Sequence, residues 1–221
     1  MGKKKLKIVM LGEGRVGKTS LLHRFINNTF DEECPSTSKA TMYANTKIEV
    51  NDTVADVSIW DTAGQERYHA LGPIYYRDAH GAVLAYDITD KESFDKVKVW
   101  LKELHQVVGE GIQVVIVGNK IDLERERKVP KKDAEDFAAA HGAQHFFCSA
   151  KLGLKVSEAF TALVKRILET TPATTSAVEK SSMTGGAREI GSTHITARTK
   201  GVKITPLDES TPPPKKEECS C

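Results

Sequence analysis

A nine-residue segment near the start of the chain constrains its fold more than any other feature. Residues 12–20 read "GEGRVGKTS" and contain the pattern Gly-x-x-x-x-Gly-Lys-Ser/Thr. The apolar run "LKIVML" precedes the segment and the amphipathic stretch "LLHRFI" follows it, which places the motif between a predicted strand and a predicted helix. Glycine lets such a loop bend until its backbone N–H groups converge on phosphate oxygens at the positive end of the helix. A glycine-rich turn that matches by chance is the alternative at this point.

The residue types of this loop fit a phosphate-binding role. The side chain of Lys18 would reach the β- and γ-phosphates, and the hydroxyl of Thr19 would bind Mg²⁺. Arg15 would direct its side chain to solvent, because the loop binds through backbone N–H groups. The predicted phosphate-binding set is Gly14, Arg15, Val16, Gly17, Lys18, Thr19 and Ser20.

Strand patterns recur along the chain. Four apolar runs are typical of strands buried on both faces of a parallel sheet: residues 6–11, 81–87, 114–119 and 144–149. Two further segments, "TKIEV" and "VADVSIW", alternate apolar and polar residues on either side of "ND", which predicts an antiparallel hairpin.

Helical patterns lie between these strands. Apolar residues recur at helical spacing over residues 94–108 and 156–168, and the sequence "TDKE" before the first of these is a candidate capping box. Alternating strands and helices predict a doubly wound α/β domain with a mostly parallel sheet over residues 6–170.

The composition changes after Thr170. Residues 171–221 are rich in Thr, Ser, Gly and Pro, and such a segment buries too little apolar surface to order itself. We therefore expect a flexible tether with an r.m.s. reach of roughly 40 Å. The chain carries 32 basic and 30 acidic residues, and the resulting net charge of +2 argues against a nucleic-acid partner.

The motif "NKID", at residues 119–122, follows a predicted strand and has the chemistry to select guanine. The carboxylate of Asp122 would accept hydrogen bonds from guanine N1–H and N2–H₂, two donors that adenine lacks. Sites built on such polar pairing discriminate by around 10⁴–10⁵. Asn119 would tie neighbouring loops together, and the apolar stem of Lys120 would cover one face of the base.

A second motif, "SAK", ends the next predicted strand and comprises Ser149, Ala150 and Lys151. The backbone amide of Ala150 would donate to guanine O6. Either motif alone is weak, and a polar strand end is the plain alternative. Together, at successive strand ends beside a phosphate loop, they favour a guanine-nucleotide site.

The segment "WDTAGQE" supplies candidates for metal binding and hydrolysis. Asp61 would hold Mg²⁺ through water, Gly64 would allow the backbone to approach the γ-phosphate, and Gln65 would orient the attacking water. Thr37, in a preceding loop, would add a second hydroxyl to Mg²⁺ when the γ-phosphate is present. Phe30 would pack edge-on against the base.

With these motifs the chain resembles the Ras superfamily of small GTPases. The stretches "WDTAGQERYHALGPIYYRDA" and "YDITDKESF" make it similar to the Rab branch, and within it to the endosomal Rab twenty-one and Rab five subgroup. The resemblance covers residues 6–170. It implies a three-layer P-loop NTPase fold, with a six-stranded, mostly parallel sheet, one antiparallel edge strand and five helices.

The resemblance also implies a mechanism and partners. Such proteins bind Mg²⁺ and GTP, hydrolyse GTP slowly to GDP, and change two segments, here residues 31–43 and 62–78, with the γ-phosphate. Implied partners are an exchange factor, a GTPase-activating protein, effectors, a Rab escort protein and a GDP-dissociation inhibitor, with a monomeric GTP-binding domain. The implied location is the cytoplasmic side of early endosomes, with a cytosolic GDP-bound pool.

Two departures from the Rab pattern stand out. "SKATMY" follows Thr37 where Rab proteins typically have Ile-Gly and then an aromatic residue, which leaves effector identity open. Lys155 stands where the loop after the "SAK" motif often has Gly, and we expect this replacement to be harmless.

The chain ends in "CSC", and its cysteines are a candidate lipid anchor. A CaaX motif needs cysteine fourth from the end, where Glu218 stands. A Cys-x-Cys ending is similar to that of many Rab proteins, whose paired cysteines are both geranylgeranylated. Because one lipid chain binds a membrane only marginally, we expect prenyl groups on both Cys219 and Cys221.

Two other functions remain open on the sequence. One is a GTP-binding module that does not usefully hydrolyse its nucleotide, against which the presence of Thr37, Asp61 and Gln65 weighs. The other is a P-loop ATPase or kinase acting on a small substrate, against which "NKID" argues.

Overall fold

The computed structural model describes residues 4–33, 41–50, 53–61 and 76–170. These residues lie within a compact unit that spans Met1–Thr175, and Ser176–Cys221 form a second unit. The predicted tether and the turn of the hairpin fall outside the described residues. None of the helices in the described part of the chain is long and apolar enough to cross a membrane.

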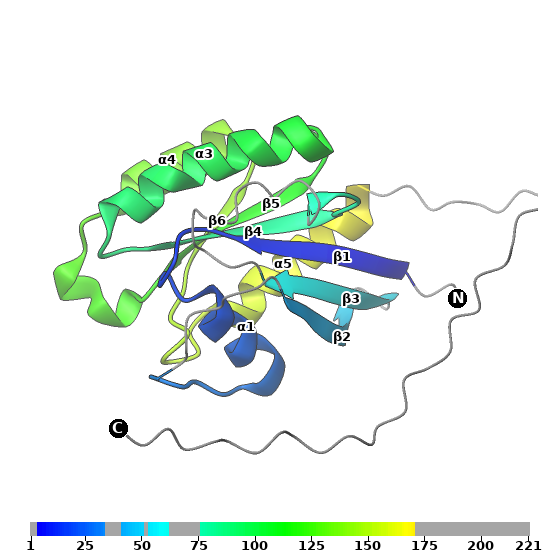
Figure 1. Cartoon of the computed structure of the whole chain (residues 1–221), viewed down its shortest axis with the longest axis horizontal. Coiled ribbons are helices and arrows are strands. Elements are labelled where there is room, and N and C mark those ends of the chain that lie inside the picture. The colour runs from blue at the N-terminus through cyan, green and yellow to red at the C-terminus, as the bar shows by residue number, and fades with distance from the viewer. Residues whose placement is uncertain (1–3, 34–40, 51–52, 62–75, 171–221) are drawn as a thin grey trace, which may run out of the picture. The chain divides into compact units, whose positions relative to one another are not determined.

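A six-stranded sheet forms the centre of the fold, in the order β2-β3-β1-β4-β5-β6 (Figure 1). The edge strand β2 runs antiparallel to β3, and the other neighbouring pairs are parallel. The strands are β1 (Lys4–Leu11), β2 (Thr41–Val50), β3 (Thr53–Asp61), β4 (Gly81–Asp87), β5 (Gln113–Asn119) and β6 (Gln144–Phe147). This is the predicted doubly wound α/β sheet with one antiparallel edge.

Helices cover both faces of the sheet (Figure 1). Those within the described residues are α1 (Lys18–Asn27), α3 (Lys91–Val108), α4 (Lys131–Ala140), α5 (Val156–Thr170) and the short 3₁₀ helix η2 (Ile121–Glu126). Helices α3 and α4 lie on one face, and α1 and α5 on the other. The result is the three-layer arrangement that the alternating pattern predicts.

Strand β1 shows why two cores form. Ile8 and Met10 are buried in the core under α1 and α5, whereas Val9 and Leu11 are buried under α3 and α4. Because successive side chains of a strand point to opposite faces, one continuous apolar run supplies both layers.

Two local predictions need correction. The capping box at "TDKE" does not form: Asp90 caps α3 by accepting a hydrogen bond from the backbone N–H of Glu92, while the Thr89 hydroxyl donates to Asp87. Strand β6 ends at Phe147, earlier than residue 149, because the backbone of Ser149 pairs with Leu154 and turns the chain into a loop.

Candidate functional site

Several of the predicted site residues that the structure describes lie at one edge of the sheet. The phosphate loop follows β1, Asp61 ends β3, Asn119 ends β5, and Ser149 lies just beyond β6. The carboxyl ends of parallel strands share one edge, and loops at that edge bind ligands in open α/β folds. The topology therefore brings together motifs that are more than one hundred residues apart in sequence.

Glycine shapes the backbone of the phosphate loop at two positions. Gly12 has φ of 139°, and a Cβ there would lie 2.1 Å from the carbonyl oxygen of Ala85. Gly17 has φ of 91°, and its Cβ would lie 2.5 Å from Nδ2 of Asn119. At both positions, the backbone conformation disfavours a side chain and the close contact leaves no room for one. Arg15 also has a positive φ, of 65°, and its side chain is exposed, as the sequence predicted.

Lys18, the first residue of α1, is 5% exposed and bends back over the loop. Its ammonium donates to the carbonyl oxygens of Gly12 and Glu13, at 2.8 and 2.9 Å. Burial lowers the pKa of Lys18 to about 8, and the charges of Asp61 and Glu13 oppose that shift. A cation is thus held inside the loop whose residue types favour phosphate.

Thr19 and Asp61 form the candidate metal site. The Thr19 hydroxyl donates to Oδ2 of Asp61 at 2.5 Å, and the carboxylate is 2% exposed. Burial raises the pKa of Asp61, while the hydrogen bond from Thr19 and the charge of Lys18 lower it. Among the described residues, Oδ1 of Asp61 has no hydrogen-bond partner. An unpaired buried carboxylate oxygen beside a hydroxyl fits Mg²⁺, which prefers oxygen ligands.

Asn119 ties three loops together, as predicted. Its side-chain amide donates to the carbonyl oxygen of Val16 at 2.9 Å, and its Oδ1 accepts from the backbone N–H of Ala150 at 3.1 Å. The residue is 2% exposed. The sequence predicts that the Ala150 amide donates to guanine O6. In the structure, that amide donates to Oδ1 of Asn119.

Asp122 and Lys120 are also held by side-chain contacts. The hydroxyl of Ser149 donates to Oδ1 of Asp122 at 2.5 Å, and Ser149 is itself fully buried. Lys120 has a positive φ of 67° and pairs through Nζ with Oδ2 of Asp87 at 2.6 Å. Asp87, which the sequence did not single out, also accepts the backbone N–H and hydroxyl of Thr89.

Arg24 is a second contributor that sequence analysis missed. It lies on α1, and its guanidinium donates to the carbonyl oxygens of Ala150 and Lys151, both at 2.8 Å. The pattern "LLHRFI" marks it only as a polar position of a helix, so no local motif would have identified it. Lys151 also forms an exposed ion pair with Glu32 at 2.6 Å.

The remaining predicted residues are placed unevenly. Phe30 is half-buried and packs against the core under α1 and α5. In the phosphate loop, Val16 is buried, Ser20 is half-buried and Gly14 is exposed. Thr37, Gly64 and Gln65 lie outside the described residues, so their roles stay predictions.

A family comparison decides what this site belongs to. The model of the Ras family matches residues 7–169, which include the described phosphate loop, Asp61, Asn119 and Ser149. The chain belongs to the Ras family. Its members are GTPases, so this protein binds GTP and GDP and hydrolyses GTP.

Individual relatives place the chain in the Rab branch. Ras-related protein Rab-21 of the sponge Geodia cydonium is 50% identical over 168 residues, 76% of this chain and 73% of that protein. Human Rab-21 is 51% identical over 164 residues, 74% and 72% of the two chains. GTP-binding protein ypt5 of Schizosaccharomyces pombe is 45% identical over 162 residues, 73% of this chain and 77% of that protein. This GTPase is a Rab protein with a role in vesicle traffic.

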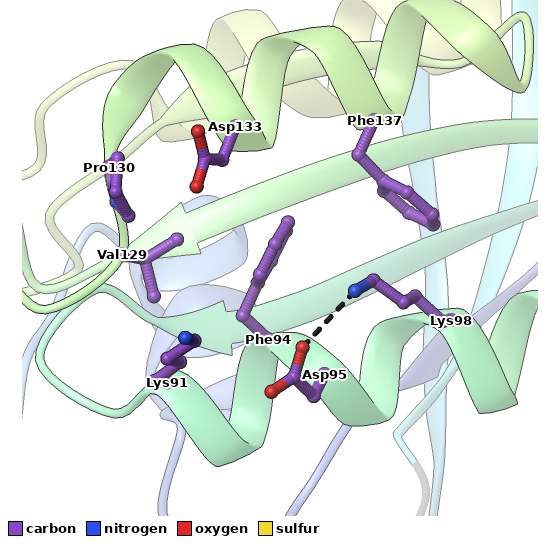
Figure 2. Close-up of a pocket in the computed structure, with 8 residues that line it drawn as sticks. All are labelled: Lys91, Phe94, Asp95, Lys98, Val129, Pro130, Asp133 and Phe137. Carbon is purple, nitrogen blue, oxygen red and sulfur yellow. Dashed lines mark hydrogen bonds and ion pairs between the residues drawn. The ribbon is translucent and has the colours of Figure 1, made fainter.

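A separate hollow of about 350 Å³ lies between α3 and α4 (Figure 2). Phe94 and Phe137 face it from the two helices, and the ammonium of Lys98 lies 5.7 and 6.0 Å from their ring centroids. Lys98 also pairs with Asp95 at 3.2 Å. None of the predicted nucleotide-binding residues that the structure describes lines this hollow.

Proposed function

We propose that this GTPase is a Mg²⁺-dependent switch in which Thr19, Thr37 and Asp61 hold the metal. The observation that carries the metal assignment is the buried Thr19–Asp61 pair, with one carboxylate oxygen unpaired among the described residues. When bound, Mg²⁺ would neutralise charge on the β- and γ-phosphates. Lys18 adds a second, fixed positive charge on the protein side of the same loop.

The base would be selected by Asp122, as the two donors on the Watson–Crick edge of guanine match a carboxylate. Ser149 supports this assignment because its hydroxyl fixes one oxygen of Asp122. Lys120, held by Asp87, would lay its stem along the base, and Phe30 would pack against the base edge.

Hydrolysis would depend on Gln65, which orients water toward the γ-phosphate while the backbone at Gly64 approaches it. Positioning and charge account for most of the catalysis in this reaction class. Without an arginine inserted by its own chain, the protein would turn over slowly, and a GTPase-activating protein would supply the missing charge. An exchange factor would then release GDP.

We also propose that the switch works on endosomal membranes, as the resemblance of its sequence to the endosomal Rab subgroup implies. Prenyl groups on Cys219 and Cys221 would anchor it to the cytoplasmic face, since two chains are needed for stable binding. A Rab escort protein would present the chain for prenylation, and a GDP-dissociation inhibitor would carry the GDP-bound form. Effectors would bind the segments around Thr37 and Gln65 in the GTP state.

Single-turnover phosphate release from GTP-loaded protein tests the switch. We expect release with Mg²⁺, acceleration by a Rab GTPase-activating protein, and loss of that acceleration in Gln65→Leu. Asp61→Asn, which keeps the shape but removes the charge, should raise the Mg²⁺ concentration needed for half-maximal release. Lys132→Ala, on the exposed face of α4, is the control and should match wild type. If wild type and Gln65→Leu respond equally to the activating protein, the assigned hydrolytic role is wrong.

The membrane assignment has its own measurement. Intact mass of the full chain from a cell membrane fraction should show two isoprenoid additions, both absent from Cys219→Ser/Cys221→Ser. An unmodified chain on membranes would contradict the predicted anchor while leaving the GTPase assignment intact.

A further inference from the structure

Arg24 links helix α1 to the loop that carries the "SAK" motif, across 126 residues of sequence. Its Nε donates to the carbonyl oxygen of Ala150 and one terminal nitrogen to that of Lys151, each at 2.8 Å. The other terminal nitrogen donates to the carbonyl oxygen of Asn28 at 2.8 Å and to its side-chain oxygen at 3.2 Å. One planar cation therefore joins this loop to the end of α1.

Few other contacts hold the outer side of this loop: Lys151 forms an exposed ion pair with Glu32, and the backbone N–H of Leu152 donates to the Ser149 hydroxyl. Residues 151–155 are all exposed, and a single isolated backbone bridge, between Ser149 and Leu154, closes the loop. The Arg24 stem also backs Gly153, whose Cβ would lie 3.4 Å from Cδ of Arg24. Exposed loops with few buried contacts open at low cost, so the two carbonyl bonds from Arg24 add to the restraint on this loop.

The base-binding groups depend on this loop. Ser149 fixes Asp122, and the Ala150 amide is paired with Asn119. Movement of the backbone at Ala150 and Lys151 would shift the Ser149 hydroxyl and release one oxygen of Asp122. The carboxylate would then be free to rotate away from the guanine donors that it is proposed to accept.

We propose that Arg24 is a positioning residue for guanine recognition, acting through the carbonyl groups of Ala150 and Lys151. It rests on the proposed role of Asp122 in binding guanine. Two consequences follow: loss of Arg24 speeds the release of GDP, and it narrows the preference for GDP over IDP. IDP carries hypoxanthine, which lacks the 2-amino group and so offers Asp122 one hydrogen-bond donor fewer than guanine. A poorly oriented Asp122 therefore weakens the binding of IDP less than that of GDP.

The geometry demands arginine rather than any cation. Five N–H donors in a fixed plane reach three carbonyl groups at once, whereas a lysine ammonium is a point charge that reaches fewer of them. Arg24→Lys should therefore lose part of the effect, and Arg24→Gln most of it. A role that needed only positive charge would be kept by lysine.

The experiment measures dissociation of fluorescent GDP and competition by unlabelled GDP and IDP, using the full chain loaded with Mg²⁺·GDP. We expect GDP release about tenfold faster in Arg24→Gln, an intermediate rate in Arg24→Lys, and a several-fold smaller GDP/IDP affinity ratio in both. Arg166→Lys is the matched control: Arg166 is also a helix arginine, and it donates to the carbonyl oxygen of Gly142 at 2.9 Å. Its release rate and affinity ratio should equal those of wild type.

The outcomes distinguish a failure of the Arg24 proposal from a failure of the proposed role of Asp122. If Arg24→Lys and Arg24→Gln release GDP at the wild-type rate, or release it faster with an unchanged GDP/IDP ratio, Arg24 does not position the guanine site. Arg24→Lys decides the question if Arg24→Gln fails to fold. If wild type itself binds GDP no better than IDP, the proposed role of Asp122 fails before Arg24 is tested.

Discussion

The two ends of the proposed nucleotide site are built in different ways. At the phosphate end, backbone conformation sets the shape: Gly12 and Gly17 adopt positive φ, and the Lys18 ammonium is held on backbone carbonyl groups. At the base end, side chains set the shape: Asn119 and Ser149 form hydrogen bonds that cross between loops. The phosphate end also keeps a buried oxygen, Oδ1 of Asp61, without a partner among the described residues.

The difference matches what each end is proposed to bind. Phosphate is a symmetrical anion, so converging N–H groups and one cation suit it, and the loop backbone and Lys18 would supply these. A base is distinguished by the positions of its donors and acceptors, so the protein must fix individual side-chain atoms. Substitutions should therefore act through steric clash at one end and through lost hydrogen bonds at the other.

The largest effect is expected from Gly12→Ala. The new Cβ would meet the Ala85 carbonyl oxygen at 2.1 Å in a backbone conformation with φ of 139°. Strain and overpacking together should cost about 4 kcal/mol in the free energy of unfolding, measured by urea denaturation. Gly142→Ala is the control, since Gly142 also has a positive φ but nothing lies within 4 Å of its Cβ, and about 1 kcal/mol is expected. Equal losses would show that the close approach to β4 is unimportant.

Asn119→Ala tests the side-chain network of the base end. Removing the amide leaves the carbonyl oxygen of Val16 and the N–H of Ala150 unpaired in a buried place, at a cost of about 3 kcal/mol in urea unfolding. Gln113→Ala removes an exposed amide that donates to Gly111 and should cost less than about 0.5 kcal/mol. A loss at Asn119 as small as that at Gln113 would mean that the loops hold their positions without it.

Asp87→Asn sharpens the contrast by changing charge without shape. The variant keeps an acceptor for Thr89 but loses the ion pair with Lys120, so we expect about 1.5 kcal/mol of destabilisation and GDP release a few-fold faster. Both quantities come from unfolding and nucleotide-dissociation measurements. Asp95→Asn, which breaks an exposed pair with Lys98, should cost less than about 0.5 kcal/mol and leave GDP release unchanged. If Asp87→Asn releases GDP at the wild-type rate, the ion pair between Lys120 and Asp87 does not contribute to base binding.

His145→Gln tests how far the polar support of the base end extends. His145 accepts or donates a hydrogen bond with the Tyr86 hydroxyl at 3.0 Å, next to Asp87 in sequence. Burial, and secondarily the charge of Arg127, lowers the pKa of His145 to about 4. As the pH falls, the unfolded chain therefore binds a proton at His145 before the folded chain does. The contribution of neutral His145 to the free energy of unfolding is complete above pH 6.5 and is lost as the pH falls toward 4.

Between pH 6.5 and pH 5, we expect the free energy of unfolding of wild type to fall by about 1 kcal/mol more than that of His145→Gln, a value that allows for the partial exposure of His145. Urea unfolding at several pH values measures this. Gln113→Ala, which removes a side chain that does not ionise, should keep the wild-type pH dependence. Parallel pH profiles for wild type and His145→Gln would show that this histidine does not titrate with unfolding.

Local patterns predicted most of the fold. Apolar runs located β1, β4 and β5, because buried parallel strands leave few polar positions, and alternation around "ND" located the antiparallel edge. The errors were also local. Thr89 fitted a capping box by residue type, but its hydroxyl bonds Asp87, and Asp90 caps α3. Competition between neighbouring polar groups of this kind is decided by distances that residue types do not encode.

The sequence by itself determined the chemistry of the site, since the spacing of Gly, Lys and Thr in the loop and the order of Asn, Lys and Asp after β5 specify which atoms are available. Only the tertiary structure decided which of those atoms meet. Thr19 contacts Asp61 across 42 residues, Asn119 contacts Val16 across 103, and Arg24 contacts Ala150 across 126. Such bonds depend on the packing of the sheet and α1 and leave no periodic trace in the chain, so Arg24 and Asp87 could be found only after folding had brought their partners within reach.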